Sequence, residues 1–181
     1  MSMLSIETIN YFLALGTILL QLAAVGLLVV YVLRTRNPSF ARIAGLVQAR
    51  ALWALFLISL VATFVTLYYS DYLGIEPCPL CWWQRIFLYP QVILLGIAAW
   101  KKDNYIADYA IVLSIFGAGV ALYQHALQML PGSGLPCPAT GISCAQRFLF
   151  EFGYITYPLM AFSLFAFLIV TMLFVRARRV A

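Results

Sequence analysis

Four cysteines in two pairs are the first indication of chemistry in this 181-residue chain. Cys78 and Cys81 form a C-P-L-C motif, whereas Cys137 and Cys144 are separated by six residues. A C-x-x-C disulfide closes a very small ring and adds little loop-closure stabilisation, so such a pair is usually redox-active or metal-binding. The second pair, which lies among prolines and glycines, is also compatible with a plain structural disulfide.

The residues that follow the first pair favour redox chemistry. Pro79 suits the first position of a helix, so Cys78 is predicted to cap that helix and Cys81 to lie in its first turn. Unpaired N–H groups and the helix dipole stabilise a thiolate at this position. Arg85 is predicted one turn deeper on the same face, where its charge adds to the stabilisation. The alternative for Arg85 is a side chain that only extends back to a polar boundary.

A four-cysteine zinc site is another interpretation of the cysteines. Zinc knuckles usually have C-x-x-C spacing in both halves of the site. Here the second pair is wider, and prolines stand on both sides of Cys137. We therefore predict no metal site.

The chain has one histidine, His125, near the end of an apolar stretch in the run Y-Q-H-A-L-Q. A guanidinium and an imidazole beside a cysteine could hold the carbonyl oxygen of a quinone. Trp82 and its neighbour Trp83 would then supply a flat apolar wall. Taken singly, these residues are also typical of the interface of a membrane protein.

The composition indicates the environment of these residues. Hydrophobic residues make up 65% of the chain and charged residues 9%, and the mean hydropathy is +0.97. Soluble domains carry about 25% charged residues. So much apolar surface must face lipid, and the net charge of +5 is then no indication of nucleic-acid binding.

Five apolar stretches are long enough to cross a membrane, which takes about 20 helical residues. They cover residues 11–33, 51–69, 82–100, 105–130 and 154–175. Long continuous runs favour helices over barrel strands, and the first run lacks the basic residues that open a signal peptide. The predicted fold class is an all-α membrane protein, a four-helix transmembrane bundle with one extra N-terminal transmembrane helix.

Basic residues orient this topology, because Lys and Arg are enriched in cytoplasmic loops. Nine of the 11 basic residues fall on one side, namely Arg34, Arg36, Arg42, Arg50, Lys101, Lys102, Arg176, Arg178 and Arg179. We expect a multi-pass protein of the cytoplasmic (inner) membrane, with its N-terminus outside and its C-terminus in the cytoplasm. Both cysteine loops, residues 70–81 and 131–153, then lie outside, where paired cysteines are expected to be disulfides or redox dithiols.

The second outer loop ends in a run of aromatic and charged residues. Phe148, Leu149, Phe150 and Phe152 stand among Arg147 and Glu151. This composition predicts a short interfacial helix that lies on the membrane surface.

Two runs carry a family resemblance. C-P-L-C-W-W-Q-R-I-F-L-Y-P resembles the signature of the DsbB/BdbC family of membrane disulfide bond formation proteins, and Y-Q-H-A-L-Q-M-L-P resembles the segment before that family's second outer loop. The resemblance covers residues 51–175, the family's four-helix core. We therefore divide the chain into an N-terminal helix with a basic loop (1–50), this core, and a basic tail (176–181). The extra N-terminal helix departs from the family pattern.

The resemblance implies a thiol–disulfide oxidoreductase that reoxidises a thioredoxin-like partner of the DsbA/BdbD type. Cys137 would form the mixed disulfide with the partner, and Cys144 would resolve it. Cys78 and Cys81 would pass the electrons to a membrane quinone, ubiquinone or menaquinone, with Cys81 nearest the ring and the arginine and histidine named above beside it.

Three other interpretations remain open at this point. One is a membrane scaffold or transport subunit with two structural disulfides, and another is a metal-handling protein. A third is a quinone-linked enzyme of the vitamin K epoxide reductase type. That group usually places its C-x-x-C after the loop cysteines, whereas here it comes before them.

Overall fold

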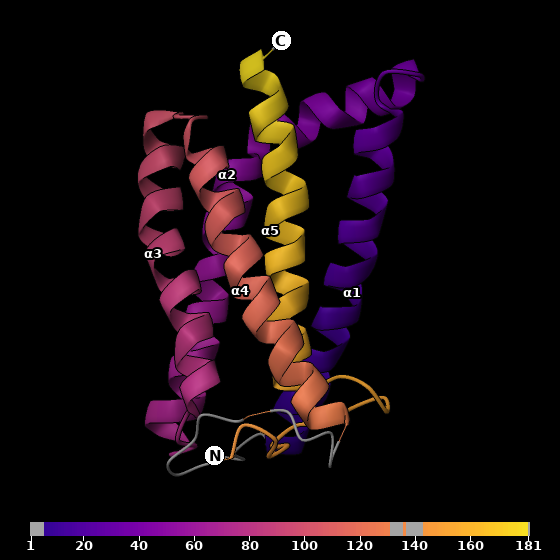
Figure 1. Cartoon of the computed structure of the whole chain (residues 1–181). Coiled ribbons are helices and arrows are strands. Elements are labelled where there is room, and N and C mark those ends of the chain that lie inside the picture. Colours follow the sequence, from indigo (N-terminus) through magenta and orange to yellow (C-terminus); the bar gives the residue numbers. More distant parts are fainter. Residues whose placement is uncertain (1–5, 131–135, 137–142, 181) are drawn as a thin grey trace.

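The computed structural model of the chain describes residues 6–130, 136 and 143–180. Within these residues five α-helices form and no strand: α1 (Ile6–Leu33), α2 (Pro38–Leu67), α3 (Pro79–Lys101), α4 (Ile106–Met129) and α5 (Tyr157–Val180). A π-helical turn, η1 (Tyr68–Tyr72), follows α2 directly. All five α-helices are long and apolar enough to cross a membrane (Figure 1). The prediction of an all-α membrane protein is confirmed.

Four helices form a bundle, and α1 packs on its side. α4 packs most extensively against α5, α3 lies against both α2 and α4, and α1 contacts α5 and α2. Figure 1 shows α5 between α4 and α1, so that α1 stands apart from α3 and α4. The predicted four-helix bundle with an extra N-terminal helix is therefore confirmed.

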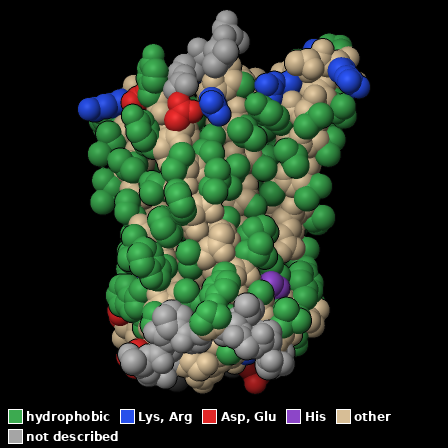
Figure 2. Space-filling view, viewed as in Figure 1, with side chains coloured by type: hydrophobic (Ala, Val, Ile, Leu, Met, Phe, Trp, Pro, Cys, Tyr) green, Lys and Arg blue, Asp and Glu red, His purple; other side chains and the backbone are tan. Residues whose placement is uncertain are grey.

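The two ends of the bundle differ in their side chains. Figure 2 shows Lys and Arg side chains gathered at the end that holds the C-terminus, and hydrophobic side chains along the length of the helices. The segment that enters α3 and the segment that enters α5 both lie at the opposite end. We call this opposite end the cysteine end, because the cysteines described below lie there.

α2 is longer than the predicted span. Asn37 caps it, since its Oδ1 accepts a hydrogen bond of 2.9 Å from the backbone N–H two residues later, and Pro38 takes the first helical position. Arg42 and Arg50 therefore lie within a helix rather than in a loop. Figure 1 shows the first turns of α2 running obliquely across the end of the bundle opposite the cysteine end.

The prediction of a short interfacial helix in the second loop is wrong. The chain forms turns there, closed by a single antiparallel bridge between Glu151 and Ile155. Phe152 and Gly153 have positive φ angles of 52° and 77°, which reverse the chain and are incompatible with a right-handed helix. Leu149 and Ile155 are buried in a cluster with α1, so these apolar side chains fill the protein interior rather than cover a membrane surface.

Polar contacts fix α1 to the bundle. The Tyr69 hydroxyl of η1 donates a 2.6 Å hydrogen bond to Asn10 Oδ1, and Gln21 Nε2 donates a 2.9 Å hydrogen bond to Ser163 Oγ of α5. Both bonds join α1 to elements far along the chain. Polar groups in apolar surroundings are costly to leave unpaired, so these bonds set how α1 sits against its neighbours.

α4 and α5 pack closely at Gly117, and this contact provides a test of the fold. A Cβ at Gly117 would overlap the buried ring of Phe165, whereas a Cβ at Gly119 would meet open space. We expect Gly117→Ala to destabilise the protein by about 1–3 kcal/mol, because the ring must move. Gly119→Ala should leave stability unchanged or raise it slightly. Thermal unfolding in detergent measures both variants, and equal effects would contradict this packing.

Candidate functional site

Cys78 caps α3, and this confirms the prediction made from Pro79. Cys78 has extended backbone angles, its Sγ accepts a hydrogen bond from the Cys81 N–H at 3.4 Å, and Pro79 takes the first helical position. The two sulfur atoms are 2.9 Å apart. The hydrogen bond between Cys78 Sγ and Cys81 Sγ, followed by burial, raises the pKa of the Cys78 thiol. Cys78 therefore holds its proton more tightly than an ordinary thiol.

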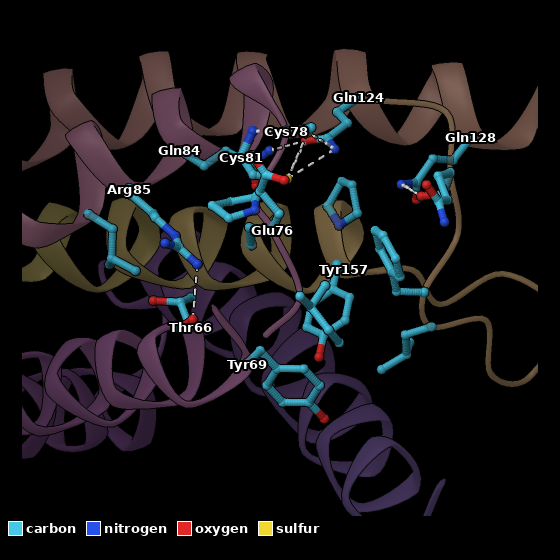
Figure 3. A pocket seen from close by; sticks show the side chains of 18 of the residues that line it. Thr66, Tyr69, Glu76, Cys78, Cys81, Gln84, Arg85, Gln124, Gln128 and Tyr157 are labelled. Atoms are coloured by element: carbon cyan, nitrogen blue, oxygen red, sulfur yellow. Dashed lines mark hydrogen bonds between the residues drawn. The ribbon is translucent and has the colours of Figure 1, made fainter. Parts of the chain in front are cut away.

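Two glutamines from the membrane spans converge on this pair. Gln124 of α4 donates from Nε2 to Cys78 Sγ at 3.1 Å and to Cys81 Sγ at 3.3 Å. Gln84 of α3 donates to Gln124 Oε1 at 2.6 Å. Figure 3 shows both side chains pointing toward the cysteines from their separate helices. The sulfur pair is therefore held between α3 and α4.

A pocket lies beside the sulfur pair, within the four-helix bundle. Cys78, Cys81, Gln84, Arg85 and Gln124 line it, and it holds about 930 Å³ of space between atoms, including the part open to the surroundings. Much of the remaining wall is apolar and includes Leu88, Phe148, Leu149, Ala161, Leu164 and Phe165. An apolar wall with a few convergent polar groups is typical of a small-molecule site.

Arg85 lines this pocket one turn deeper than Cys81, as the spacing predicts. Its Nη2 donates a 2.9 Å hydrogen bond to the Thr66 carbonyl of α2. The π-helical turn η1 begins two residues after Thr66, and such turns are frequent at functional sites. The guanidinium also lies 5.1 Å from the Trp82 ring centre. Trp82 is 52% exposed and is not among the residues that line the described pocket, so it contacts the cation rather than the pocket.

His125 is not among the residues that line the described pocket with Arg85. Its Nδ1 forms a 2.8 Å hydrogen bond with Thr156 Oγ1, immediately before α5. Consecutive helical residues point about 100° apart, so His125 and Gln124 face different neighbours. Gln124 faces the sulfurs. A role for His125 at a quinone stays a prediction.

The second cysteine pair is described in part, because Cys137 lies outside the described residues. Cys144 is fully buried and packs with Cys78 in one cluster at the cysteine end. Gln128 of α4 holds this segment, since its Nε2 donates to the Gln146 carbonyl at 2.9 Å and approaches the Cys144 carbonyl at 3.4 Å. The structure thus brings three of the four predicted cysteines together.

Comparison with known proteins identifies the family. The family model described as "Disulfide bond formation protein DsbB" matches residues 48–175. The chain belongs to the DsbB family. It is 33% identical over 129 residues to disulfide bond formation protein C of Bacillus subtilis, which covers 71% of this chain and 94% of the relative. It is 40% identical over 118 residues to a probable disulfide formation protein of Chlamydia trachomatis, which covers 65% and 86%. No solved structure gives a significant match.

Membership of the DsbB family confirms the resemblance inferred from the two sequence runs. The protein is thus a membrane thiol oxidoreductase of disulfide bond formation. Sequence reasoning predicted Cys78, Cys81, Cys144 and Arg85, which the structure brings to one end of the bundle, but missed Gln84, Gln124 and Gln128. A signal for these residues was present, because polar side chains inside apolar spans are rare and mark functional positions.

Gln128 provides a test of how the Cys144 segment is held in this DsbB-family protein. Gln128→Leu removes two hydrogen bonds to the segment, at a cost of about 1–2 kcal/mol. The population of protein in which the Cys144 segment is transiently open should then increase about 5- to 30-fold. The measurement is the rate at which a maleimide labels Cys144 in the reduced protein, relative to Cys78 in the same sample.

The matched control for this test is Gln91→Leu. Gln91 of α3 is fully buried and bonds Ser114 of α4, within the same bundle but away from the loop. Its substitution should leave the labelling of Cys144 unchanged. Equal labelling rates in the Gln128→Leu and unsubstituted proteins would show that Gln128 does not hold the segment.

Proposed function

We propose that this protein reoxidises an extracytoplasmic thioredoxin-like dithiol protein of the DsbA/BdbD type and passes the electrons to membrane quinone. The observation that carries the proposal is the position of Cys81. Cys81, like Cys78, lines a largely apolar pocket among four transmembrane helices. A lipid-soluble electron acceptor is the kind of ligand that such a pocket favours.

The residues of the pocket suit a quinone, either ubiquinone or menaquinone. A flat apolar ring can pack against the apolar wall, and a ring carbonyl can accept a hydrogen bond from a donor such as Arg85. When bound, a quinone supplies an acceptor for two electrons and two protons. The chain's own residues then hold the sulfur pair and the cation at the same wall.

Thiol–disulfide exchange connects the two cysteine pairs. A partner thiolate attacks Cys137 of the Cys137–Cys144 disulfide, forms a mixed disulfide with Cys137 and displaces Cys144 as a thiolate. The partner's second thiol, rather than Cys144 as the resemblance implies, then resolves the mixed disulfide and releases the oxidised partner. The Cys137–Cys144 dithiol then reduces a Cys78–Cys81 disulfide. Burial of Cys144 in one cluster with Cys78 supports direct exchange between these sulfurs. Each exchange needs an attacking thiolate and a stabilised leaving group.

We also propose that the cysteine end faces outward from the cytoplasmic membrane and that the C-terminus lies in the cytoplasm. The basic side chains at the C-terminal end support this orientation through the positive-inside rule (Figure 2). The compartment outside that membrane is oxidising, and disulfide chemistry is expected there.

The deciding experiment uses the purified protein with a reduced thioredoxin-like protein. Oxidation of that dithiol should require added quinone, with one quinone reduced for each dithiol oxidised, as followed by quinone absorbance and thiol counting. Cys81→Ser should abolish quinone reduction, because a serine cannot form the disulfide. Full activity without quinone, or in Cys81→Ser, would refute the proposal.

Arg85 should affect quinone binding more than partner binding. Hydrogen bonds from charged donors contribute about 1.5–3 kcal/mol. Arg85→Ala should therefore raise the KM for quinone at least about tenfold, while the KM for the dithiol partner changes less than about twofold. Arg147→Ala is the control, because Arg147 lies over the Phe150 ring and does not line the described pocket. Equal changes in both KM values would show that the Arg85 side chain only extends to a polar boundary and has no specific role at the quinone.

A further inference from the structure

Gln124 donates to both sulfurs from a single nitrogen. A carboxamide nitrogen carries two hydrogens, and Cys78 Sγ and Cys81 Sγ lie 3.1 and 3.3 Å from it, so each sulfur can receive one N–H. Gln124 is only 2% exposed. Water therefore has little access to replace these donors, and the sulfurs depend on the carboxamide.

Gln84 fixes which end of the Gln124 carboxamide faces the sulfurs. Its Nε2 donates to Gln124 Oε1 at 2.6 Å and is held on α3 by the Leu80 carbonyl at 3.4 Å. If the Gln124 carboxamide turned by half a rotation, its Nε2 would meet the Nε2 of Gln84, donor against donor. Its oxygen would then face the sulfurs. The contact with Gln84 therefore selects the orientation that presents N–H groups to the cysteines.

The orientation of Gln124 matters because charge moves to Cys81 during exchange. When a thiolate attacks Cys78 of the oxidised pair, a new S–S bond forms at Cys78 and the Cys78–Cys81 bond breaks. Its electron pair stays on Cys81 Sγ, which takes over the negative charge of the attacking thiolate. Hydrogen bonds to a charged acceptor are stronger than those to a neutral one. The N–H groups of Gln124 therefore stabilise the reduced, charged state more than the disulfide.

We propose that Gln124, oriented by Gln84, is a catalytic residue that makes the Cys78–Cys81 disulfide easier to reduce by donating to the Cys81 thiolate as it forms. The inference rests on the proposed function for the direction in which electrons reach this pair. The position of the thiol–disulfide equilibrium itself can be measured without quinone or partner protein.

The test measures that equilibrium in glutathione buffers of graded composition. The full chain carries Cys137→Ala and Cys144→Ala, so that only the first pair reports, and a maleimide mass tag counts its thiols. Gln124→Leu removes both N–H donors and keeps a side chain of similar size. It should shift the equilibrium about tenfold toward the disulfide, which corresponds to a potential about 30 mV lower for a two-electron couple. Gln84→Leu should shift it in the same direction by a smaller factor, because Gln124 can then turn.

Gln91→Leu separates this effect from a general loss of packing between α3 and α4. Gln91 is buried and joins the same two helices through Ser114, without contact to the sulfurs. The thiol–disulfide equilibrium constant of Gln91→Leu should stay within about twofold of that of the unsubstituted protein. An unchanged equilibrium in Gln124→Leu, or an equal shift in Gln91→Leu, would overturn the proposal.

If Gln124→Leu does not fold, Gln84→Leu decides the question, and an unchanged equilibrium in that variant would overturn the proposal. This proposal and the proposed function can be refuted separately. Absence of quinone reduction by the unsubstituted protein would refute the proposed function and would leave the glutathione comparison valid.

Discussion

The cap that Cys78 places on α3 fixes where the chemistry of this protein can occur. Because its Sγ accepts the Cys81 N–H, both sulfurs are held in one turn at the point where the chain enters the bundle. Pro79 supports this start, since proline has no N–H to satisfy and its φ angle already suits a helix. The same turn packs with the buried Cys144 and also lines the pocket. A sulfur pair at this boundary can therefore exchange with a loop and still face an apolar cavity.

α4 brings the remaining parts of the site to that boundary. Gln124 contacts the first cysteine pair, and Gln128, one turn later on the same face, holds the carbonyls of the second segment. Tyr123 adds a third tie, because its hydroxyl donates a 2.6 Å hydrogen bond to the carbonyl of Pro136, the residue before Cys137. Three side chains within two turns thus position the surroundings of both pairs. The close packing of α4 against α5 limits how far this helix can shift, so the spacing between the pairs is set by the core of the bundle.

Local signals in the sequence were sufficient for part of this arrangement. Apolar runs of membrane length predict the helices, and the order of residues in C-P-L-C predicts the cap, since both depend on neighbours in the chain. The face of α4 that meets the sulfurs could not be read in this way. Whether His125 or Gln124 points toward Cys81 depends on the rotation of α4 against α3, which is set by packing along both helices. The surface helix was mispredicted for a similar reason, because burial of Leu149 against α1 outweighs the local pattern.

α1 influences the pocket without lining its described wall. Tyr69 is a wall residue whose hydroxyl bonds Asn10, and its ring lies edge-on to that of Tyr157, another wall residue, with 5.0 Å between ring centres. Breaking a buried hydrogen bond leaves an unpaired hydroxyl at a cost of about 1–3 kcal/mol. Tilting of α1 at this point is therefore coupled to movement of η1 and of the pocket wall. The four-helix bundle supplies the sulfur, cation and amide groups, and α1 restricts the freedom of the aromatic wall that faces them.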